Sequence, residues 1–263
     1  MINNKKIKIY FVGIGGIGMS GIAELMHEIG YTVLGSDKIE NDNVKRLKKI
    51  GINVKIGHDK KNLGKVNAVV FSSAINPNNP EIQEAKKKHI PIVSRADMLS
   101  ELMKNKKCIA VAGSHGKTTT TSLVGNILES GKLDPTIVNG GIINSLSKNN
   151  KFGRGKWMVV EADESDGSFL KLPHQISIIT NLDIEHLDYY KTPKKLYSSF
   201  EAFIMNLPFY GISIVNEDDK NLKKIIQKND TRKIITYSIK NRKSNFFIEK
   251  IYFDNRFSYF TLN

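Results

Sequence analysis

The sequence predicts an α/β protein made of two doubly wound parallel units, and three observations support this prediction. Short apolar runs rich in β-branched residues alternate with stretches of helical periodicity along the chain. Two of these runs lead through glycine-rich turns, "GIGGIG" and "GSHG", into helical stretches. At 263 residues, the chain has the length of about two ordinary domains.

The first part of the chain carries a regular alternation of strands and helices. Strands are expected at residues 7–12, 32–36, 68–72 and 90–93, and helices at 17–29, 43–50, 80–88 and 95–104. Strands that alternate with helices in this way form a parallel sheet covered by helices. We therefore expect a Rossmann-like, doubly wound domain over residues 1–107, which ends at the basic stretch "NKK".

A second alternation begins at the buried run "CIAVAG". Strands are expected at 108–112, 157–162, 176–180, 212–215 and 233–237, and helices after Lys117, at 193–206 and at 218–228. The last stretch, "FFIEKIYFDNRFSYFTL", predicts two strands around a turn at Asp254-Asn255. We therefore expect a second α/β domain over residues 108–263, in which the sequence stops directly after a β-hairpin.

Composition argues against a membrane-spanning, secreted or disulfide-bonded protein. The apolar runs are shorter than the roughly 20 residues of a membrane-spanning helix, and the N-terminus lacks the pattern of a secretion signal. Cys108 is the single cysteine, which excludes an internal disulfide and a thiolate metal cluster. These features predict a cytoplasmic protein with no membrane partner.

The formal net charge of +14 raises the question of nucleic-acid binding. Lysines spread along the chain supply most of this charge, whereas arginine, the better bidentate ligand for phosphate and guanine, is sparse. Aromatic residues do not interleave with the basic runs. We therefore expect a solvated, lysine-rich surface and no nucleic-acid partner, with a positive field that favours small anionic substrates.

The first chemical motif is the turn "GIGGIGMS". Gly13, Gly15 and Gly18 have the spacing of a dinucleotide-binding turn between a strand and a helix, where glycines let the backbone approach a pyrophosphate. Asp37 ends the second strand, where such folds place an acid against a ribose hydroxyl. A nicotinamide dehydrogenase would fit this motif, and so would a tight turn without a ligand.

The second motif, "AGSHGKTTTTS", is a short variant of a phosphate-binding loop. Only two residues separate Gly113 from Gly116, where the usual loop has four. Lys117 is expected to contact the β and γ phosphates of a nucleotide, and the Thr118 hydroxyl to bind Mg²⁺. This half is therefore expected to be P-loop NTPase-like.

Acidic residues follow two further strands of the second series. The run "WMVV" ends in "EADESD", where Glu161 and Asp163 are candidate metal ligands and solvated loop acids are the alternative. The run "IIT" is followed by "NLDIEHLD", in which His186 lies among acids. Because these strand ends are expected at the same edge of the sheet, His186 is a candidate ligand, although a lone histidine is more often an ordinary hydrogen-bonded side chain.

Together these motifs resemble the Mur ligases. The resemblance is carried, in order along the chain, by "GIGGIGMSGIAEL", "SSAI", "SRADML", "AGSHGKTTTTS", "EADESDGSF", "TNLDIEHLD" and "NLPFYG". It covers nearly the whole sequence. It also accounts for the short phosphate loop, which is similar to the variant found in these ligases.

The resemblance implies a reaction and its participants. Such a ligase uses ATP to phosphorylate the lactyl carboxylate of UDP-N-acetylmuramate, and the amine of L-alanine then displaces phosphate from the acyl phosphate to leave an amide. ATP, Mg²⁺ (with Mn²⁺ as an alternative), UDP-N-acetylmuramate and L-alanine are therefore the implied cofactors and substrates.

The resemblance also assigns roles by position. Lys117, Glu161 and His186 would be catalytic: Lys117 would bind the transferring phosphate, Thr118 and Glu161 one metal ion, and His186 a second. The ATP-binding residues would be Gly113, Ser114, His115, Gly116, Lys117, Thr118 and Thr119. The glycine turn would serve UDP instead of NAD, and the UDP-sugar-binding residues would be Gly13, Gly15, Gly16, Ile17, Gly18, Asp37, Ser72, Ser73, Asn139 and Gly140, with Arg95 beside them.

The sequence departs from the family pattern at several positions. Ser114 stands where threonine is usual, Ile184-Glu185 replaces Pro-Asp, and Asn149 falls in a loop that follows the family only loosely. The family's His-Asn-x-x-Asn-Ala segment and its third domain, which binds the amino acid, are not matched. We therefore expect the N-terminal and central portions of such a ligase, with weak or no ligation by this chain alone unless a separate chain supplies the remainder.

Three other functions stay open at this stage. A UDP-sugar-binding remnant would bind the sugar nucleotide without any dependence on ATP. A sister Mur ligase would attach another amino acid or a peptide. A nicotinamide dehydrogenase would bind NAD(H) but would leave the phosphate loop without a purpose.

Overall fold

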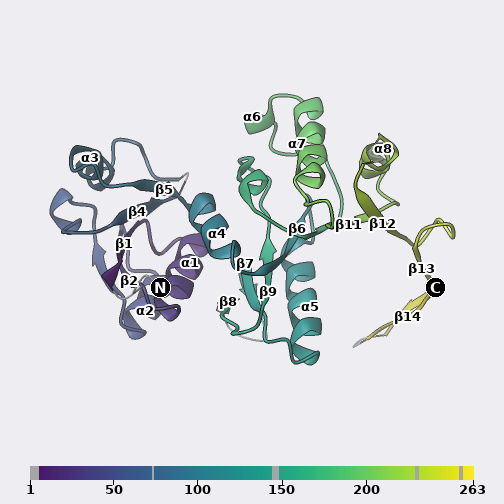
Figure 1. The fold of residues 1–263 in the computed structure, drawn as a ribbon, viewed down its shortest axis with the longest axis horizontal. Coiled ribbons are helices and arrows are strands. Elements are labelled where there is room, and N and C mark those ends of the chain that lie inside the picture. Colours follow the sequence, from purple (N-terminus) through teal and green to yellow (C-terminus); the bar gives the residue numbers. More distant parts are fainter. Residues whose placement is uncertain (1–5, 73, 144–147, 229–230, 255–256) are drawn as a thin grey trace. The chain divides into compact units, whose positions relative to one another are not determined.

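The computed structural model describes residues 6–72, 74–143, 148–228, 231–254 and 257–263, and its ribbon is drawn in Figure 1. The chain divides into two compact units. The first comprises residues 1–104 and 135–155, and the second comprises residues 105–134 and 156–263. The units are therefore not two uninterrupted stretches, because a segment within the expected second domain belongs to the first unit.

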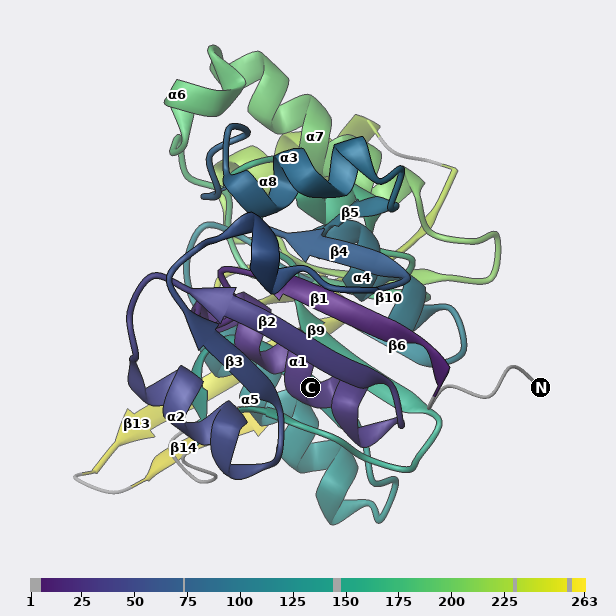
Figure 2. The ribbon, with the colours of Figure 1, turned by 90° about the vertical axis from the view of Figure 1, so that its left-hand side faces the viewer.

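The first unit is built on a five-stranded sheet with the order β3-β2-β1-β4-β5 (Figure 2). Its elements are β1 (Lys8–Val12), α1 (Ile17–Glu28), β2 (Thr32–Asp37), α2 (Asp42–Lys49), β3 (Asn53–Ile56), η2 (Lys60–Asn62), β4 (Ala68–Phe71), α3 (Pro80–Lys87), β5 (Ile92–Ser94), α4 (Arg95–Met103), β7 (Thr136–Ile143) and β8 (Lys148–Lys151). All neighbouring strands of the sheet are parallel. This is the doubly wound order, in which ligands bind beyond the carboxyl end of the central strand β1.

Local sequence explains where the helices of this unit begin. Asn41 accepts a hydrogen bond from the Val44 amide at the start of α2, and Asn79 caps α3 just before Pro80. Side-chain oxygens at these positions satisfy amides that have no partner within the helix. On one side of the sheet, β1 and β4 pack with α3 in a core that includes Tyr10, Val69 and Ile82.

The antiparallel hairpin of β7 and β8 completes the first unit. Both strands contact α1. Gly21 of α1 makes this packing possible, because a Cβ atom there would lie 1.6 Å from Nδ2 of Asn150. The hairpin therefore depends on a glycine inside a helix, where this residue is otherwise unfavourable.

The second unit contains a parallel sheet with the order β13-β12-β11-β10-β6-β9, to which β14 is added antiparallel to β13. Its elements are β6 (Lys107–Ala112), α5 (Lys117–Ser130), β9 (Trp157–Glu161), η3 (Ser168–Lys171), β10 (Ile176–Ile179), α6 (Leu187–Tyr190), α7 (Pro193–Met205), β11 (Ile212–Asn216), α8 (Lys220–Lys228), β12 (Lys233–Ser238), β13 (Phe246–Phe253) and β14 (Ser258–Leu262). Strands β6, β9 and β10 are neighbours, so the loops that follow them meet at one edge of the sheet.

The α/β prediction is confirmed, and the structure adds elements that the sequence did not indicate. These are β3, the β7–β8 hairpin and the short helix α6. The expected C-terminal hairpin is present as β13 and β14, and Asp254 next to its turn accepts a hydrogen bond from the Phe257 amide. Among the described residues, no helix is both long and apolar enough to cross a membrane.

Candidate functional site

The glycine turn of the first unit lies between β1 and α1, beyond the carboxyl end of β1. Gly13 has φ +75°, a conformation that favours glycine. The amides of Gly13 and Ile14 both donate to the Ser36 carbonyl at 2.9 Å, and the Gly15 amide donates to Oδ2 of Asp37 at 2.8 Å. The end of β2 therefore fixes the conformation of the turn.

Side chains from the start of α2 close over Gly15. Nδ2 of Asn41 and Nδ2 of Asn43 donate to the Gly15 carbonyl at 3.1 and 3.0 Å. A Cβ atom on Gly15 would lie 2.7 Å from Cγ2 of Val44. The close packing against Val44 therefore requires a glycine at position 15. A ligand that approached the turn closely would require one as well.

A buried carboxylate, Glu81, supports this turn from within the unit. Its oxygens accept hydrogen bonds from the hydroxyls of Tyr10 and Ser36 at 2.8 and 2.6 Å and from Nδ2 of Asn62 at 3.0 Å. Nδ1 of His58 lies 2.9 Å from the same carboxylate. Sequence reasoning missed this network, because its members are scattered along the chain and none belongs to a recognisable motif.

The structure places the other expected UDP-sugar residues as follows. Gly16 precedes the first residue of α1, Ile17 is exposed, and a Cβ atom on Gly18 would lie 3.2 Å from Nη1 of Arg95. Ser72 follows β4, and Ser73 lies outside the described residues.

The expected muramyl-side residues belong to the β7–β8 hairpin. Asn139 is buried, and its backbone N–H donates a hydrogen bond to Oδ1 of Asn150 at 3.1 Å. Gly140 is within β7 and Asn149 is within β8. The hairpin and the glycine turn are thus parts of the same compact unit.

The phosphate loop of the second unit joins β6 to α5 and requires both of its glycines. Gly113 has φ +135°, and a Cβ atom there would lie 2.1 Å from Oγ1 of Thr180. Gly116 has φ +78° and precedes α5, but a Cβ atom there would meet open space. Position 113 therefore requires glycine both because a side chain would clash and because φ is positive. Position 116 requires glycine because of its positive φ alone.

The residues that follow β10 hold this loop in place. The His115 amide donates to Oδ1 of Asn181 at 2.8 Å, and Oγ1 of Thr180 donates to the His115 carbonyl at 2.7 Å. The Asp183 amide donates to Oγ of Ser114 at 2.9 Å. The hydroxyl of Ser114 thus has a structural role, and Thr180 and Asn181 are supporting residues that sequence reasoning did not select.

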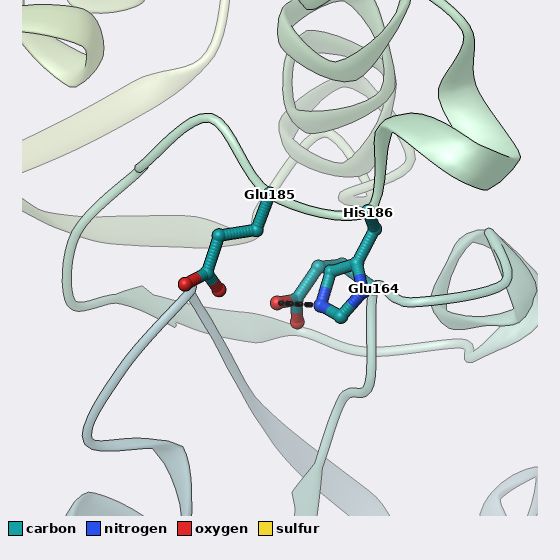
Figure 3. A group of neighbouring side chains, drawn as sticks. All are labelled: Glu164, Glu185 and His186. Atoms are coloured by element: carbon teal, nitrogen blue, oxygen red, sulfur yellow. Dashed lines mark ion pairs between the residues drawn. The ribbon is translucent and has the colours of Figure 1, made fainter.

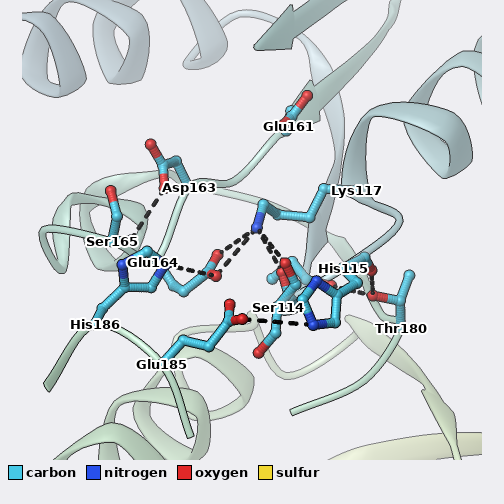
Figure 4. Close-up of polar contacts among 12 residues, drawn as sticks. Ser114, His115, Lys117, Glu161, Asp163, Glu164, Ser165, Thr180, Glu185 and His186 are labelled. Carbon is cyan, nitrogen blue, oxygen red and sulfur yellow. Dashed lines mark hydrogen bonds and ion pairs between the residues drawn. The ribbon is translucent and has the colours of Figure 1, made fainter. Parts of the chain in front are cut away.

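Lys117 lies at the centre of the site and is paired with Glu164 (Figure 4). Its Nζ lies 3.1 and 2.9 Å from the two carboxylate oxygens of Glu164 and donates to the Gly113 and Ser114 carbonyls at 2.7 and 3.2 Å. The side chain of Glu164 is only 1% exposed and that of Lys117 is 14% exposed. Burial raises the pKa of the Glu164 carboxyl, and the Lys117 ammonium opposes this shift.

Thr118 and Glu161 are brought together, as the sequence suggested they would be. Oγ1 of Thr118 donates to Oε2 of Glu161 at 2.9 Å, from the first turn of α5 to the last residue of β9. Both groups offer oxygen atoms, which are the ligands that Mg²⁺ prefers. Asp163 instead accepts a hydrogen bond from the Ser165 amide within its own loop, and Thr119 is exposed.

A second group of possible ligands comprises Glu164, Glu185 and His186 (Figure 3). One ligand atom from each lies within 4.8 Å of the others, and Nε2 of His186 is 3.7 Å from Oε1 of Glu164. His186 has φ +55°, an uncommon conformation for a histidine, at the start of α6. Two carboxylates and an imidazole suit a divalent ion such as Mg²⁺ or Mn²⁺, so the donor set fits the expected metal.

Two further side chains complete this description. Nε2 of His115 lies 3.2 Å from Oδ2 of Asp183 and 3.5 Å from Oε1 of Glu185, so His115 faces the acids beside the loop. Cys108 is buried in β6, and burial raises the pKa of its thiol to about 12. Cys108 is therefore part of the packed interior of the sheet.

Glu164 is the functional residue that sequence reasoning missed. It lies in the motif "EADESD", but the sequence does not indicate which of the four acids of this motif turns inward. The structure separates these acids, since Glu161 contacts Thr118, Glu164 contacts Lys117, and the other two accept hydrogen bonds from amides of their own loop.

Comparisons with known proteins identify the family of this chain. Residues 8–107 match the Mur ligase family, catalytic domain, and residues 111–263 match the Mur ligase middle domain. A UDP-N-acetylmuramate–L-alanine ligase from Methylobacterium sp. (strain 4-46) is 54% identical over 89% of this chain and 50% of its own length. The chain thus spans about half the length of the curated relatives it matches.

Solved structures show the same fold. The crystal structure of a UDP-N-acetylmuramate–alanine ligase from Thermotoga maritima has a TM-score of 0.81 and 31% identity, over 93% of this chain and 55% of that one. A UDP-N-acetylmuramate:L-alanyl-gamma-D-glutamyl-meso-diaminopimelate ligase from Neisseria meningitides has a TM-score of 0.87 at 23% identity, over 98% of this chain and 84% of that one, a likeness of fold alone. With both parts of the chain matched in order, this chain belongs to the Mur ligase family.

Proposed function

We propose that this chain provides the sugar-nucleotide and ATP sites of a ligase that joins L-alanine to UDP-N-acetylmuramate. The observation that carries the proposal is the grouping of Lys117, the Thr118–Glu161 pair and the Glu164–His186 pair at the carboxyl ends of β6, β9 and β10. This grouping supplies a cation and oxygen ligands at the end of a phosphate loop, as phosphoryl transfer requires. The names of the similar curated proteins support the choice of substrates.

In this proposal, Lys117 binds the transferring phosphoryl group of ATP, and the first turn of α5 directs backbone amides toward the phosphates. Thr118 and Glu161 hold one metal ion, and His186 with its neighbouring acids holds a second. When bound, Mg²⁺ offsets the charge of the phosphoryl group as it moves to the lactyl carboxylate. The carboxylate becomes an acyl phosphate, which the amine of L-alanine attacks to form the amide and release phosphate.

The first unit binds the UDP part of the sugar nucleotide at the turn of Gly13, Gly15 and Gly18. Amides at the start of α1 offer the positive end of a helix to the pyrophosphate. The glycine turn of the first unit contains no lysine, whereas the phosphate loop of the second unit leads directly into Lys117. A turn without a lysine suits a nucleotide that is bound but whose phosphates are not transferred.

Two alternatives are separated by experiment. A UDP-sugar-binding remnant would leave the Lys117 site without a nucleotide. A sister ligase would use another amino acid or peptide in place of L-alanine. We place the reaction in the cytoplasm, where ATP is available.

The β13–β14 hairpin suggests where the rest of such a ligase packs. It exposes a group of large apolar side chains: Tyr252, Phe253, Phe257, Phe260 and Leu262. Exposed apolar groups of this size mark interaction surfaces. We propose that the part of these relatives that this chain does not match packs against this hairpin.

An assay of ADP release tests the proposed function. The purified chain would be given Mg²⁺, ATP and UDP-N-acetylmuramate, with L-alanine or another amino acid, alone and after addition of the remaining half of a curated relative. We expect little release from the chain alone and L-alanine-dependent release in the mixture, which Lys117→Ala abolishes. Release in the mixture that ignores L-alanine and follows a different amino acid would instead identify a sister ligase.

A further inference from the structure

The Lys117–Glu164 pair has a consequence beyond the positioning of a lysine. A phosphate loop normally attracts a nucleotide through the charge of its lysine. Here the two oxygens of Glu164 lie 3.1 and 2.9 Å from Nζ, in surroundings where Glu164 is nearly inaccessible to water. Because screening by water is weak at such a site, the carboxylate cancels much of the attraction that Lys117 would exert.

The surroundings of this pair are acidic. Glu161 and Asp163 belong to the segment that leads to Glu164 (Figure 4), and Asp183 and Glu185 lie beside His115. A nucleotide triphosphate without a metal ion carries about four negative charges and would meet these carboxylates. A divalent cation reverses this balance, because it reduces the charge of the nucleotide and gives the carboxylates a partner.

We propose that Glu164 makes the phosphate loop selective for metal-bound nucleotide by neutralising Lys117 until a divalent cation arrives. The inference rests on the proposed function, because it assigns a selectivity to the same ATP site. Lys117 is held by Glu164 and by the Gly113 and Ser114 carbonyls. When a metal-bound nucleotide enters, Lys117 exchanges Glu164 for phosphate oxygens, and Glu164 is left beside His186 and Glu185, within reach of the cation.

The test is the affinity for a non-hydrolysable ATP analogue, AMP-PNP, measured by calorimetry in excess EDTA and in excess Mg²⁺. Glu164→Gln keeps the shape of the side chain but removes its charge. We expect this variant to bind metal-free AMP-PNP at least tenfold more tightly than the unmodified chain, because Lys117 is released from a charged partner. In Mg²⁺ the gain is expected to disappear.

Asp183→Asn is the matched control, since it removes one negative charge from a neighbouring acid that pairs with His115 and not with Lys117. We expect it to change the metal-free affinity by less than threefold. An equal gain in both variants would overturn the proposal, because net charge alone would then explain it. An unchanged metal-free affinity of Glu164→Gln would overturn it as well.

Two further variants keep the test decisive. Glu164→Asp retains the charge and should remain weak toward metal-free AMP-PNP, which also guards against a fold defect in the glutamine variant. In a Lys117→Ala background, Glu164→Gln should give no gain, because the gain acts through Lys117.

Inorganic tripolyphosphate serves as a second probe that needs only the loop. If the unmodified chain binds neither probe even with Mg²⁺, both the proposed ATP site and this inference fail. If it binds in Mg²⁺ but Glu164→Gln behaves like the unmodified chain in EDTA, only the inference fails.

Discussion

The two glycine turns of this molecule have the same local plan but different surroundings. Each follows a buried parallel strand and leads into a helix, α1 in one unit and α5 in the other. The first turn is held by neutral amides and by Asp37, whose oxygens face the Gly15 amide at 2.8 Å and the Ile39 amide at 3.4 Å. The second has Lys117 in the helix itself and carboxylates on the two neighbouring strand ends.

Under the proposed function, this difference means that a glycine turn specifies a place for phosphate but not the reaction of that phosphate. The first turn can hold a pyrophosphate through backbone groups, without groups that stabilise charge transfer. In the proposed function, the second adds a cation and metal ligands, which phosphoryl transfer needs.

The largest expected effect is at Gly113. Gly113→Ala should destabilise the second unit by about 3 kcal/mol, because the new Cβ meets Thr180 and the backbone must keep φ +135°. Gly116→Ala should cost only about 1 kcal/mol, because its Cβ meets open space. Urea unfolding of both variants measures the difference. Equal losses would mean that the steric contact with Thr180 does not constrain the loop.

A smaller effect is expected for the hydroxyl of Thr118. Thr118→Val should weaken the binding of AMP-PNP in Mg²⁺ about tenfold, because the hydroxyl facing Glu161 is lost as a metal ligand. The binding of UDP-N-acetylmuramate should not change. Thr120→Val, in the same helix but outside the expected ATP-binding residues, is the control and should bind both nucleotides as the unmodified chain does. Isothermal titration gives all of these constants, and an equal loss in both valine variants would argue against a metal role for Thr118.

In the first unit, Asp37→Asn tests the support of the glycine turn. Loss of the charged acceptor of the Gly15 amide should weaken the binding of UDP-N-acetylmuramate by about 1 kcal/mol, or roughly fivefold, and leave AMP-PNP binding unchanged. Asp42→Asn removes an exposed acid at the start of α2 and serves as the control. If Asp37→Asn binds the sugar nucleotide normally, the conformation of the turn does not depend on this acceptor.

The smallest effect concerns pH. His174 is buried against Phe203, and burial lowers the pKa of its ring from the ordinary value of 6.5. Folding thus favours the neutral ring, so this contribution to stability is present above pH 6.5 and is lost as the pH falls. Thermal unfolding between pH 7.5 and 5 should show a steeper loss of stability for the unmodified chain than for His174→Asn. Parallel curves would show that His174 does not contribute.

Much of the fold could be predicted from the sequence, because most strands are continuous apolar runs and most helices have one apolar face. Strand β3 was missed since "NVKI" is short and mostly exposed, and β7 since "TIVNGGII" is interrupted by a pair of glycines. The membership of the β7–β8 hairpin in the first unit depends on packing of Asn150 on Gly21, a contact between distant residues. Local patterns carry no information about such contacts.

The residues of the candidate site also include some that the sequence indicated and some that it did not. Lys117, Thr118, Glu161 and His186 could be selected because each follows a predicted strand end, and the structure brings these residues to one edge of the sheet. Glu164 could not be selected, because only the path of the loop after β9 decides which acid is buried. The roles of the UDP-sugar residues stay a prediction.

The most direct test of this account is whether the two turns hold two different nucleotides. Calorimetry in Mg²⁺ would measure the binding of UDP-N-acetylmuramate and AMP-PNP to the unmodified chain, to Lys117→Ala and to Gly15→Ala, whose Cβ would lie 2.7 Å from Val44. The account predicts that Lys117→Ala loses only AMP-PNP and that Gly15→Ala loses only the sugar nucleotide. Binding of the sugar nucleotide without any Lys117-dependent binding of AMP-PNP would contradict it and would indicate a UDP-sugar-binding protein without an ATP site.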